Sequence, residues 1–89
     1  MQEKPIQIIN KLGLHARAAT KLANLAMRYS CKVDVEAKGK TTNAKSIMSL
    51  MLLAASKGTD IVLRTEGDDE AEAMEALVTL INNRFDEGE

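Results

Sequence analysis

The feature that most constrains the fold of this chain is a strict alternation of apolar and charged residues over residues 31–38. The apolar positions are Cys31, Val33, Val35 and Ala37, and the charged positions between them are Lys32, Asp34, Glu36 and Lys38. Successive side chains of a β-strand point to opposite faces, so this alternation predicts a strand with one buried face and one solvated face. Such strands are typical of an antiparallel sheet, and other elements have to cover the buried face.

A second strand is expected directly after this one. Gly39 supplies a turn, and residues 40–44 form the short partner strand of a β-hairpin. Two further strands are expected at residues 5–10 and 60–65, which are rich in isoleucine, valine and leucine. The single proline, Pro5, falls at the start of the earlier one, where its missing N–H does least harm.

Three helices are expected between and after these strands. The first covers residues 16–29, which are rich in alanine and leucine. The second covers residues 47–57, with Ser46 as its N-cap and Gly58 placed to end it. The third follows the acidic residues 68–70, which suit the first turn of a helix. The apolar stripe of the third helix consists of Met74, Leu77, Val78, Ile81 and Phe85.

The element order is therefore β-α-β-β-α-β-α, which predicts an α+β fold. We expect a four-stranded antiparallel sheet covered on one face by three helices, in a single domain of residues 1–89. The hairpin sets the pairing of its own two strands, whereas these patterns leave the order of the other strands open.

Composition disfavours several classes of function. The net charge is −1, and the only aromatic residues are Tyr29 and Phe85, so neither a polycationic surface nor a stacking platform for nucleic acid is expected. Cys31 is the only cysteine, which suits a reducing compartment, and we expect it to be a half-buried core residue. No signal peptide is evident, and no apolar run is long enough to span a bilayer. We therefore expect a cytoplasmic monomer without membrane insertion.

The candidate functional residue is His15, the only histidine of the chain. It follows Gly13, which lets the backbone turn, and it precedes a helix whose first turn contains Arg17. Unpaired N–H groups at a helix N-terminus and a nearby guanidinium both stabilise an anion, so we predict that His15 accepts a phosphoryl group and that Arg17 stabilises it. The alternative is a surface or capping histidine. No metal-ligand cluster or Cys–His pair accompanies it, so we expect no metal, no cofactor and no complete enzyme active site.

The segment 47–54 is apolar nearly all round a helix, although a two-layer domain buries only one helix face. We expect some of its side chains to lie on the surface, where a methionine offers an adaptable docking contact. The residues expected to face inward are Ile47, Leu50, Met51 and Ala54, and those expected to face outward are Met48 and Leu52. Burial of the whole helix is the alternative.

At two fixed positions the chain resembles the histidine-containing phosphocarrier proteins (HPr) of the bacterial phosphoenolpyruvate-dependent phosphotransferase system. The matching runs are residues 10–17 (NKLGLHAR) and 44–48 (AKSIM). The resemblance implies an open-faced β-sandwich and phosphorylation of His15 on Nδ1 by enzyme I, which is charged from phosphoenolpyruvate. The phosphoryl group would then pass to a histidine of an enzyme IIA protein, so the chain would be a carrier and not an enzyme. The partner docking residues expected on this basis are Ile47, Met48, Leu52, Thr20 and Lys21.

Ser46 aligns with a serine that a dedicated kinase phosphorylates in many bacteria, which implies a regulatory phosphorylation site with a kinase or phosphorylase as partner. From the sequence alone, a plain N-cap is the other reading of Ser46. A rival function follows from the first possibility: a regulatory protein-binding module that is switched at Ser46, with His15 incidental.

Two details refine the resemblance. Ala18 stands where the family usually has proline, and since alanine is an excellent helix former we expect a retuned site and not an inactive one. The runs 50–55 (LMLLAA) and 82–87 (NNRFDE) resemble the nitrogen-related carriers, which serve regulation instead of sugar uptake. The run 45–48 (KSIM) resembles the general sugar-system carrier, and we favour that branch slightly.

Overall fold

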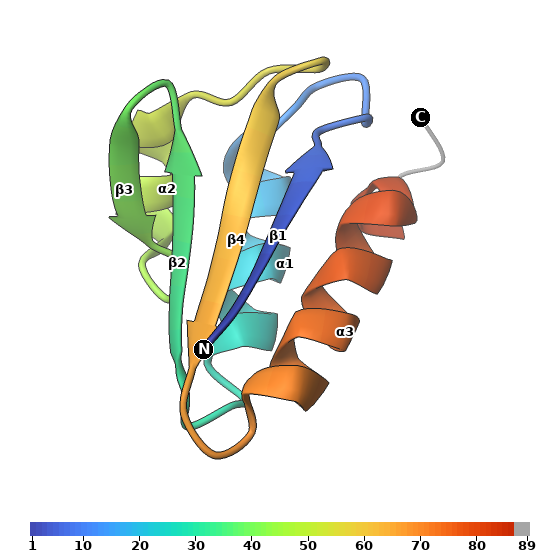
Figure 1. Cartoon of the computed structure of the whole chain (residues 1–89). Helices are drawn as coiled ribbons and strands as arrows, with labels where there is room; N and C mark the ends of the chain where they lie inside the picture. The colour runs from blue at the N-terminus through green and yellow to red at the C-terminus, as the bar shows by residue number, and fades with distance from the viewer. Residues whose placement is uncertain (87–89) are drawn as a thin grey trace.

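The structure is a computed structural model that describes residues 1–86. Its elements are β1 (Gln2–Gln7), α1 (Ala16–Ala26), β2 (Lys32–Ala37), β3 (Lys40–Asn43), α2 (Ile47–Leu53), β4 (Asp60–Glu66), α3 (Glu70–Asn82) and the 3₁₀ turn η1 (Arg84–Asp86). Within these residues the strands form one antiparallel sheet in the order β1-β4-β2-β3. All three helices lie on the same face of the sheet (Figure 1). The predicted α+β architecture is confirmed.

The β2–β3 hairpin has the predicted alternation of burial. Val33 and Val35 are fully buried beneath the helices, and the charged residues that alternate with them, Lys32, Asp34 and Glu36, lie toward the outer face. Lys38 and Gly39 both have left-handed φ values, 53° and 79°, which is the conformation that two-residue hairpin turns require. Cys31, just before β2, is buried. It therefore belongs to the core, more fully than the half-buried position expected.

The boundaries predicted for the first strand are wrong. Residues 5–10 were expected, whereas β1 begins at Gln2 and ends at Gln7, so that Pro5 lies inside it. β1 is an edge strand that pairs only with β4, and a proline is tolerated there because its missing N–H can face away from the ladder. Ile8 follows the strand and is fully buried.

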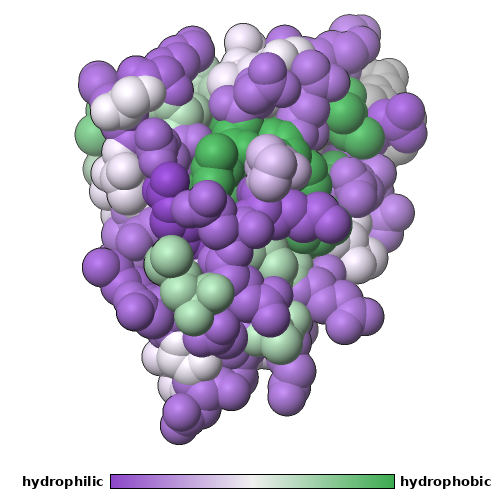
Figure 2. Space-filling view, viewed as in Figure 1, coloured by the Kyte–Doolittle hydropathy of each residue, from purple (hydrophilic) through white to green (hydrophobic). Residues whose placement is uncertain are grey.

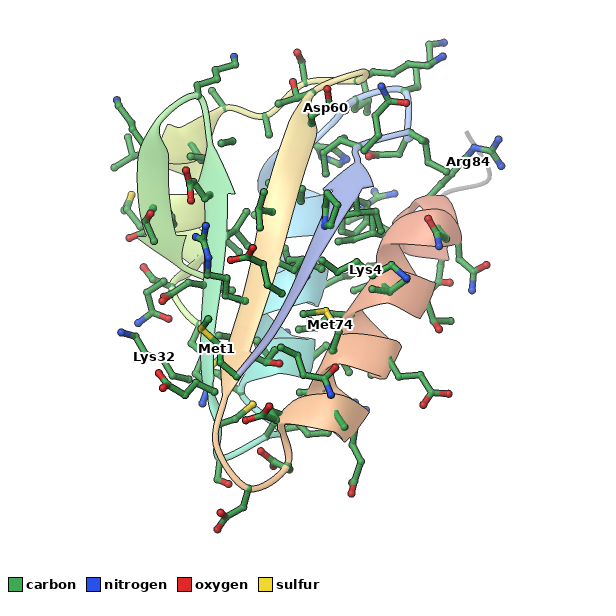
Figure 3. All side chains as sticks on the ribbon, in the orientation of Figure 1. Met1, Lys4, Lys32, Asp60, Met74 and Arg84 are labelled. Atoms are coloured by element: carbon green, nitrogen blue, oxygen red, sulfur yellow. The ribbon has the colours of Figure 1, made fainter. Side chains whose placement is uncertain are left out.

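The hydrophobic core lies between the sheet and the helix layer. Its largest fully buried apolar side chains are Ile8, Leu22, Val33, Val35, Leu50, Ile61, Leu63, Leu77, Ile81 and Phe85. Met74 extends this core at the β1 edge, where it points from α3 toward the sheet (Figure 3). Every strand except the short β3 and every helix packs into this one core, which fixes the helices relative to the sheet.

The outer face of the sheet is open. Arg64 in β4 bridges its two neighbouring strands there, because its guanidinium is 2.6 Å from a carboxylate oxygen of Glu3 in β1 and 2.6 Å from one of Glu36 in β2. Figure 2 shows this face as mostly hydrophilic, with a hydrophobic area in its upper centre and smaller ones elsewhere. The face therefore carries solvated polar groups, as the alternation in the sequence indicates.

The first and last helices, α1 and α3, both end earlier than predicted. α1 ends at Ala26 and is followed by a turn in which the Tyr29 N–H donates to the Ala26 carbonyl oxygen. α3 ends at Asn82, so Phe85 lies outside the helix, in a turn with left-handed φ values. Phe85 is nevertheless fully buried, and the apolar stripe identified the core residue although not its local conformation.

The second helix is shorter than predicted. α2 ends at Leu53 instead of Lys57, and Ala54 takes a left-handed conformation with φ 54°. The chain then turns back, and the carbonyl oxygen of Ala55 accepts a hydrogen bond of 2.8 Å from the N–H of Leu14. A continued helix would direct this carbonyl along its own axis, so the contact with the distant loop is incompatible with a longer helix.

Candidate functional site

His15 is the N-cap residue of α1. Its backbone is extended, with φ −78° and ψ −179°, and its carbonyl oxygen accepts the first hydrogen bond of the helix from the Ala19 N–H at 2.8 Å. The imidazole makes no side-chain cap to the helix, and the residue is partly exposed. The first-turn N–H groups have no carbonyl partner within the helix, so they create a positive electrostatic potential beside His15.

The loop before His15 is held rigidly by a buried side chain. Asn10 is fully buried, and its Nδ2 donates a hydrogen bond of 2.8 Å to the carbonyl oxygen of Gly13. The Gly13 N–H in turn donates to the carbonyl oxygen of Asn10 at 3.2 Å. Leu14 is buried just before the histidine. These contacts fix the direction in which the chain enters α1.

Gly13 also allows the loop to approach the segment after α2. It has φ +67°, and a Cβ atom there would lie 2.5 Å from the carbonyl oxygen of Ala55 and 2.7 Å from Cα of Ser56. The Leu14 hydrogen bond to Ala55 depends on this close approach. The sequence indicated only a turn at Gly13. It did not indicate the approach to Ala55 and Ser56, because these residues are distant from Gly13 in the chain.

The same segment is tied to the end of β1. Ile8 donates to the carbonyl oxygen of Thr59 at 2.9 Å and accepts from the N–H of Gly58 at 2.7 Å. The loop that carries the histidine and the loop that leaves α2 therefore form one hydrogen-bonded unit. This unit places the end of α2 against the base of α1.

Arg17 and its neighbours line the first two turns of α1. Arg17 is exposed, whereas Ala18 is fully buried against the core. Thr20 donates from Oγ1 to the carbonyl oxygen of Ala16 at 2.7 Å. Lys21 is partly buried, and its Nζ donates to the carbonyl oxygen of Phe85 at 2.7 Å, so its ammonium group is anchored at η1.

α2 presents an apolar surface beside this unit. Met48, Met51 and Leu52 are 69%, 43% and 74% exposed, and we call them the α2 docking face. Leu50 and Leu53 point into the core. The predicted outward directions of Met48 and Leu52 are thus confirmed, as is the inward direction of Leu50.

The predicted inward directions of Met51 and Ala54 are wrong, since both are exposed. Ile47 is only partly buried. The i, i+3 spacing from Met48 was a signal that Met51 shares its exposed face. Leu12, which is 65% exposed in the loop before His15, was also missed. A loop residue has no periodicity from which its exposure follows.

Ser46 begins α2 as the sequence predicts. It is the N-cap residue, and its Oγ accepts a hydrogen bond of 3.2 Å from the N–H of Ser49. The side chain is only partly buried. The hydroxyl therefore lies at the N-terminus of α2, two residues before Met48.

A carboxylate at the opposite end of the domain has a structural role. Asp69 accepts hydrogen bonds from the N–H groups of Ser30 and Cys31, each at 2.9 Å, and these bonds hold the pKa of its carboxyl group below its ordinary value. Burial, together with the hydrogen bond to Asp69, raises the pKa of the Cys31 thiol. Asp69 thereby joins the start of α3 to the start of β2.

Two negative findings concern the part of the chain that the structure describes. Across residues 1–86 no group of three or more His, Cys, Asp or Glu side chains could hold a metal ion. In the same range no helix has the length and apolar character needed to cross a membrane.

Comparison with known proteins agrees with this geometry. Residues 2–83 match the family model described as "PTS HPr component phosphorylation site". The chain is 60% identical to the phosphocarrier protein HPr of Pseudomonas aeruginosa over 94% of both chains, and 56% identical to that of Pseudomonas putida over the whole of both. Its structure is similar to the crystal structure of HPr-C-His from Thermoanaerobacter tengcongensis, with a TM-score of 0.94 and 48% identity over 98% of each chain. The chain belongs to the HPr family, the phosphocarrier proteins of the phosphotransferase system.

Proposed function

We propose that His15 is the residue that carries the phosphoryl group, received from enzyme I and passed to a histidine of an enzyme IIA protein. The observation that carries the proposal is the position of His15 as the N-cap residue of α1, partly exposed and held by a rigid loop. First-turn N–H groups next to the ring stabilise a bound phosphate. Arg17, exposed in the same turn, adds a guanidinium that can hold two phosphate oxygens at once.

The transfer itself needs only one nucleophilic nitrogen on this chain. The lone pair of Nδ1 forms a bond to phosphorus while the bond between phosphorus and the donor's nitrogen breaks, and Nε2 keeps its proton. The reverse sequence of bond changes delivers the group to the next histidine. Water would compete with the acceptor histidine for the phosphoryl group. The carrier therefore has to hold the group without hydrolysing it, and both partners have to exclude water when they dock.

The α2 docking face supports the recognition step. It is apolar, it contains two adaptable methionine side chains, and it lies on the helix whose end contacts the His15 loop. We propose that both partners bind across Met48, Leu52 and the partly buried Ile47, with Thr20 and Lys21 at the margin on α1. The reaction would take place in the cytoplasm, which suits the unpaired thiol of Cys31.

The test is phosphorylation with enzyme I and phosphoenolpyruvate, followed by intact-mass measurement. We expect a mass gain of one phosphoryl group that is labile in acid and that is absent in His15→Ala. The matched control is Ser46→Ala, which removes the other candidate phosphate acceptor, a partly buried hydroxyl, and should still be phosphorylated. Phosphorylation that persists in His15→Ala would contradict the proposal. Purified sugar-specific and nitrogen-related enzyme IIA proteins are then added separately. The one that removes the phosphoryl group from the carrier identifies the branch.

A second, regulatory role is favoured by the position of Ser46. Its partly buried hydroxyl caps α2 beside the α2 docking face, so a phosphate there would gain from the helix N-terminus. The same phosphate would place about two negative charges next to an apolar contact surface. We expect Ser46→Asp to weaken docking of enzyme I while His15 remains chemically intact. If partner binding responds to Ser46→Asp but not to phosphorylation of His15, the chain is a binding module and not a relay.

A further inference from the structure

The sulfur atoms of the chain differ sharply in their exposure. The single thiol, Cys31, and the thioether of Met74 are both buried in the core. Met48 and Met51 are instead exposed on α2, and Met27 at the end of α1 and Met1 before β1 are exposed as well. An oxidant in solution therefore reaches surface thioethers before it reaches the thiol. The raised pKa of Cys31 acts in the same direction, because the thiolate is the reactive form of cysteine.

The two methionines of α2 form a pair. They are three residues apart, so both lie on one side of the helix, with Leu52 next to Met51. The pair starts two residues after the Ser46 cap and ends just before the turn whose Ala55 carbonyl binds the His15 loop. Two oxidisable sulfur atoms therefore lie on the α2 docking face, that of Met48 among the residues of the proposed contact and that of Met51 beside them.

We propose that Met48 and Met51 form a reversible oxidation site through which peroxide weakens partner docking. This inference rests on the proposed relay function. Each thioether takes one oxygen atom from hydrogen peroxide, forming methionine sulfoxide and releasing water. Sulfur loses two electrons, the peroxide O–O bond breaks, and its oxygen atoms are reduced. A methionine sulfoxide reductase returns the thioether with two electrons and two protons from a dithiol, which becomes a disulfide, and the sulfoxide oxygen leaves as water.

The physical effect of oxidation is local. A sulfoxide oxygen is a strong hydrogen-bond acceptor, and burying it against an apolar partner surface without a donor costs free energy. Both side chains are exposed in the free protein, so the added oxygen is solvated there and the fold is not disturbed. The penalty therefore appears when a partner covers the helix. Oxidation should raise the KM of enzyme I for this carrier, with little change in kcat.

The experiment treats the purified protein with hydrogen peroxide and maps oxidation by peptide mass spectrometry. We expect one added oxygen on each exposed methionine, Met48 and Met51 among them, and none on the buried Met74. Phosphoryl transfer from enzyme I should show KM raised about tenfold, the size of losing a contact at an interface hot spot. Methionine sulfoxide reductase should restore the original KM. Circular dichroism before and after treatment checks that the fold is unchanged.

Two variants separate the site from general oxidation. Met48→Leu/Met51→Leu should show the same KM before and after peroxide, each value compared with that of the same variant. Met27→Leu, which alters an exposed methionine outside the α2 docking face, should respond to peroxide like the original chain. Unchanged KM after complete oxidation of both methionines overturns the inference, as does an equal response in the double variant. Failure of the untreated protein to accept phosphate would instead refute the proposed function.

Discussion

Gly13→Ala tests the geometry that holds His15 in place. The substitution adds one methyl group where φ is +67° and where the new Cβ would lie 2.5 Å from the carbonyl oxygen of Ala55. The obstacle is backbone and not the end of a flexible side chain, so the two loops have to move apart. The Leu14 hydrogen bond to Ala55 is then lengthened or lost.

The size of the effect has two parts. A left-handed backbone costs a residue with a Cβ about 1–2 kcal/mol relative to glycine. Forcing a methyl group into a closely packed contact adds about 1–3 kcal/mol. The free energy of unfolding should therefore fall by about 2–5 kcal/mol, a large part of the stability of a domain of this size.

Gly39→Ala and Gly58→Ala are the matched controls. Both glycines have left-handed φ values, 79° and 89°, but a Cβ atom at either position would meet nothing within 4 Å. Each control substitution places alanine in a left-handed conformation and reduces the conformational entropy of the unfolded chain, as Gly13→Ala does, but it creates no steric contact. Each should lower the free energy of unfolding by about 1–2 kcal/mol.

Urea unfolding followed by circular dichroism gives the three free energies by linear extrapolation. Gly13→Ala should be the most destabilising by at least about 1 kcal/mol and should accept phosphate from enzyme I more slowly. If Gly13→Ala lowers the free energy of unfolding no more than the two controls do, the close approach to Ala55 does not hold the loop. If it is destabilised but phosphorylated at the original rate, the position of His15 does not depend on that contact.

Further substitutions test other contacts. Ser46→Ala should lower the free energy of unfolding by about 1 kcal/mol in urea, because it removes the side-chain cap of α2; a loss near zero would show that the cap contributes nothing. The hydrogen bonds from Ser30 and Cys31 lower the pKa of Asp69 in the folded protein. The ionised carboxylate therefore stabilises the fold fully above pH 3.8, the ordinary pKa of the group, and this stabilisation is lost as the pH falls through the lower pKa of the folded state. Asp69→Asn should weaken that dependence in acid titrations of stability, and an unchanged profile would exclude the role. Arg17→Gln should shorten the lifetime of the phosphorylated form, measured by release of inorganic phosphate, and an equal lifetime would remove Arg17 from the site.

The elements set by local patterns could be predicted from the sequence. The alternation over residues 31–38 predicted a strand with one buried face, and Gly39 predicted the turn after it; both are confirmed. Ser46 was predicted as an N-cap and is one. In each case the decisive interactions lie within a few residues of one another, so periodicity and turn chemistry contain enough information.

The features that were missed depend on residues far apart in the chain. α2 ends at Leu53, and the segment after it accepts a hydrogen bond from Leu14, a partner that no pattern near residue 53 indicates. β1 includes Pro5 because the strand is at the edge of the sheet, which follows only from the strand order. At the site, the helix-cap position of His15 was foreseen, whereas the contact between Gly13 and Ala55 was not.

The pairing of β1 with β4 has a consequence for synthesis of the protein. Glu3 and Arg64, joined in the finished sheet, are 61 positions apart in the chain. During synthesis β1 must therefore wait for a partner strand whose Arg64 is made 61 residues after Glu3, a non-local pairing that slows folding. The His15 loop also waits, because Ala55 is made some forty residues after it. Nascent chains that lack residues 55–66 thus lack the contacts that hold the His15 loop and β1, so phosphoryl transfer at the proposed site should begin only after β4 has been made.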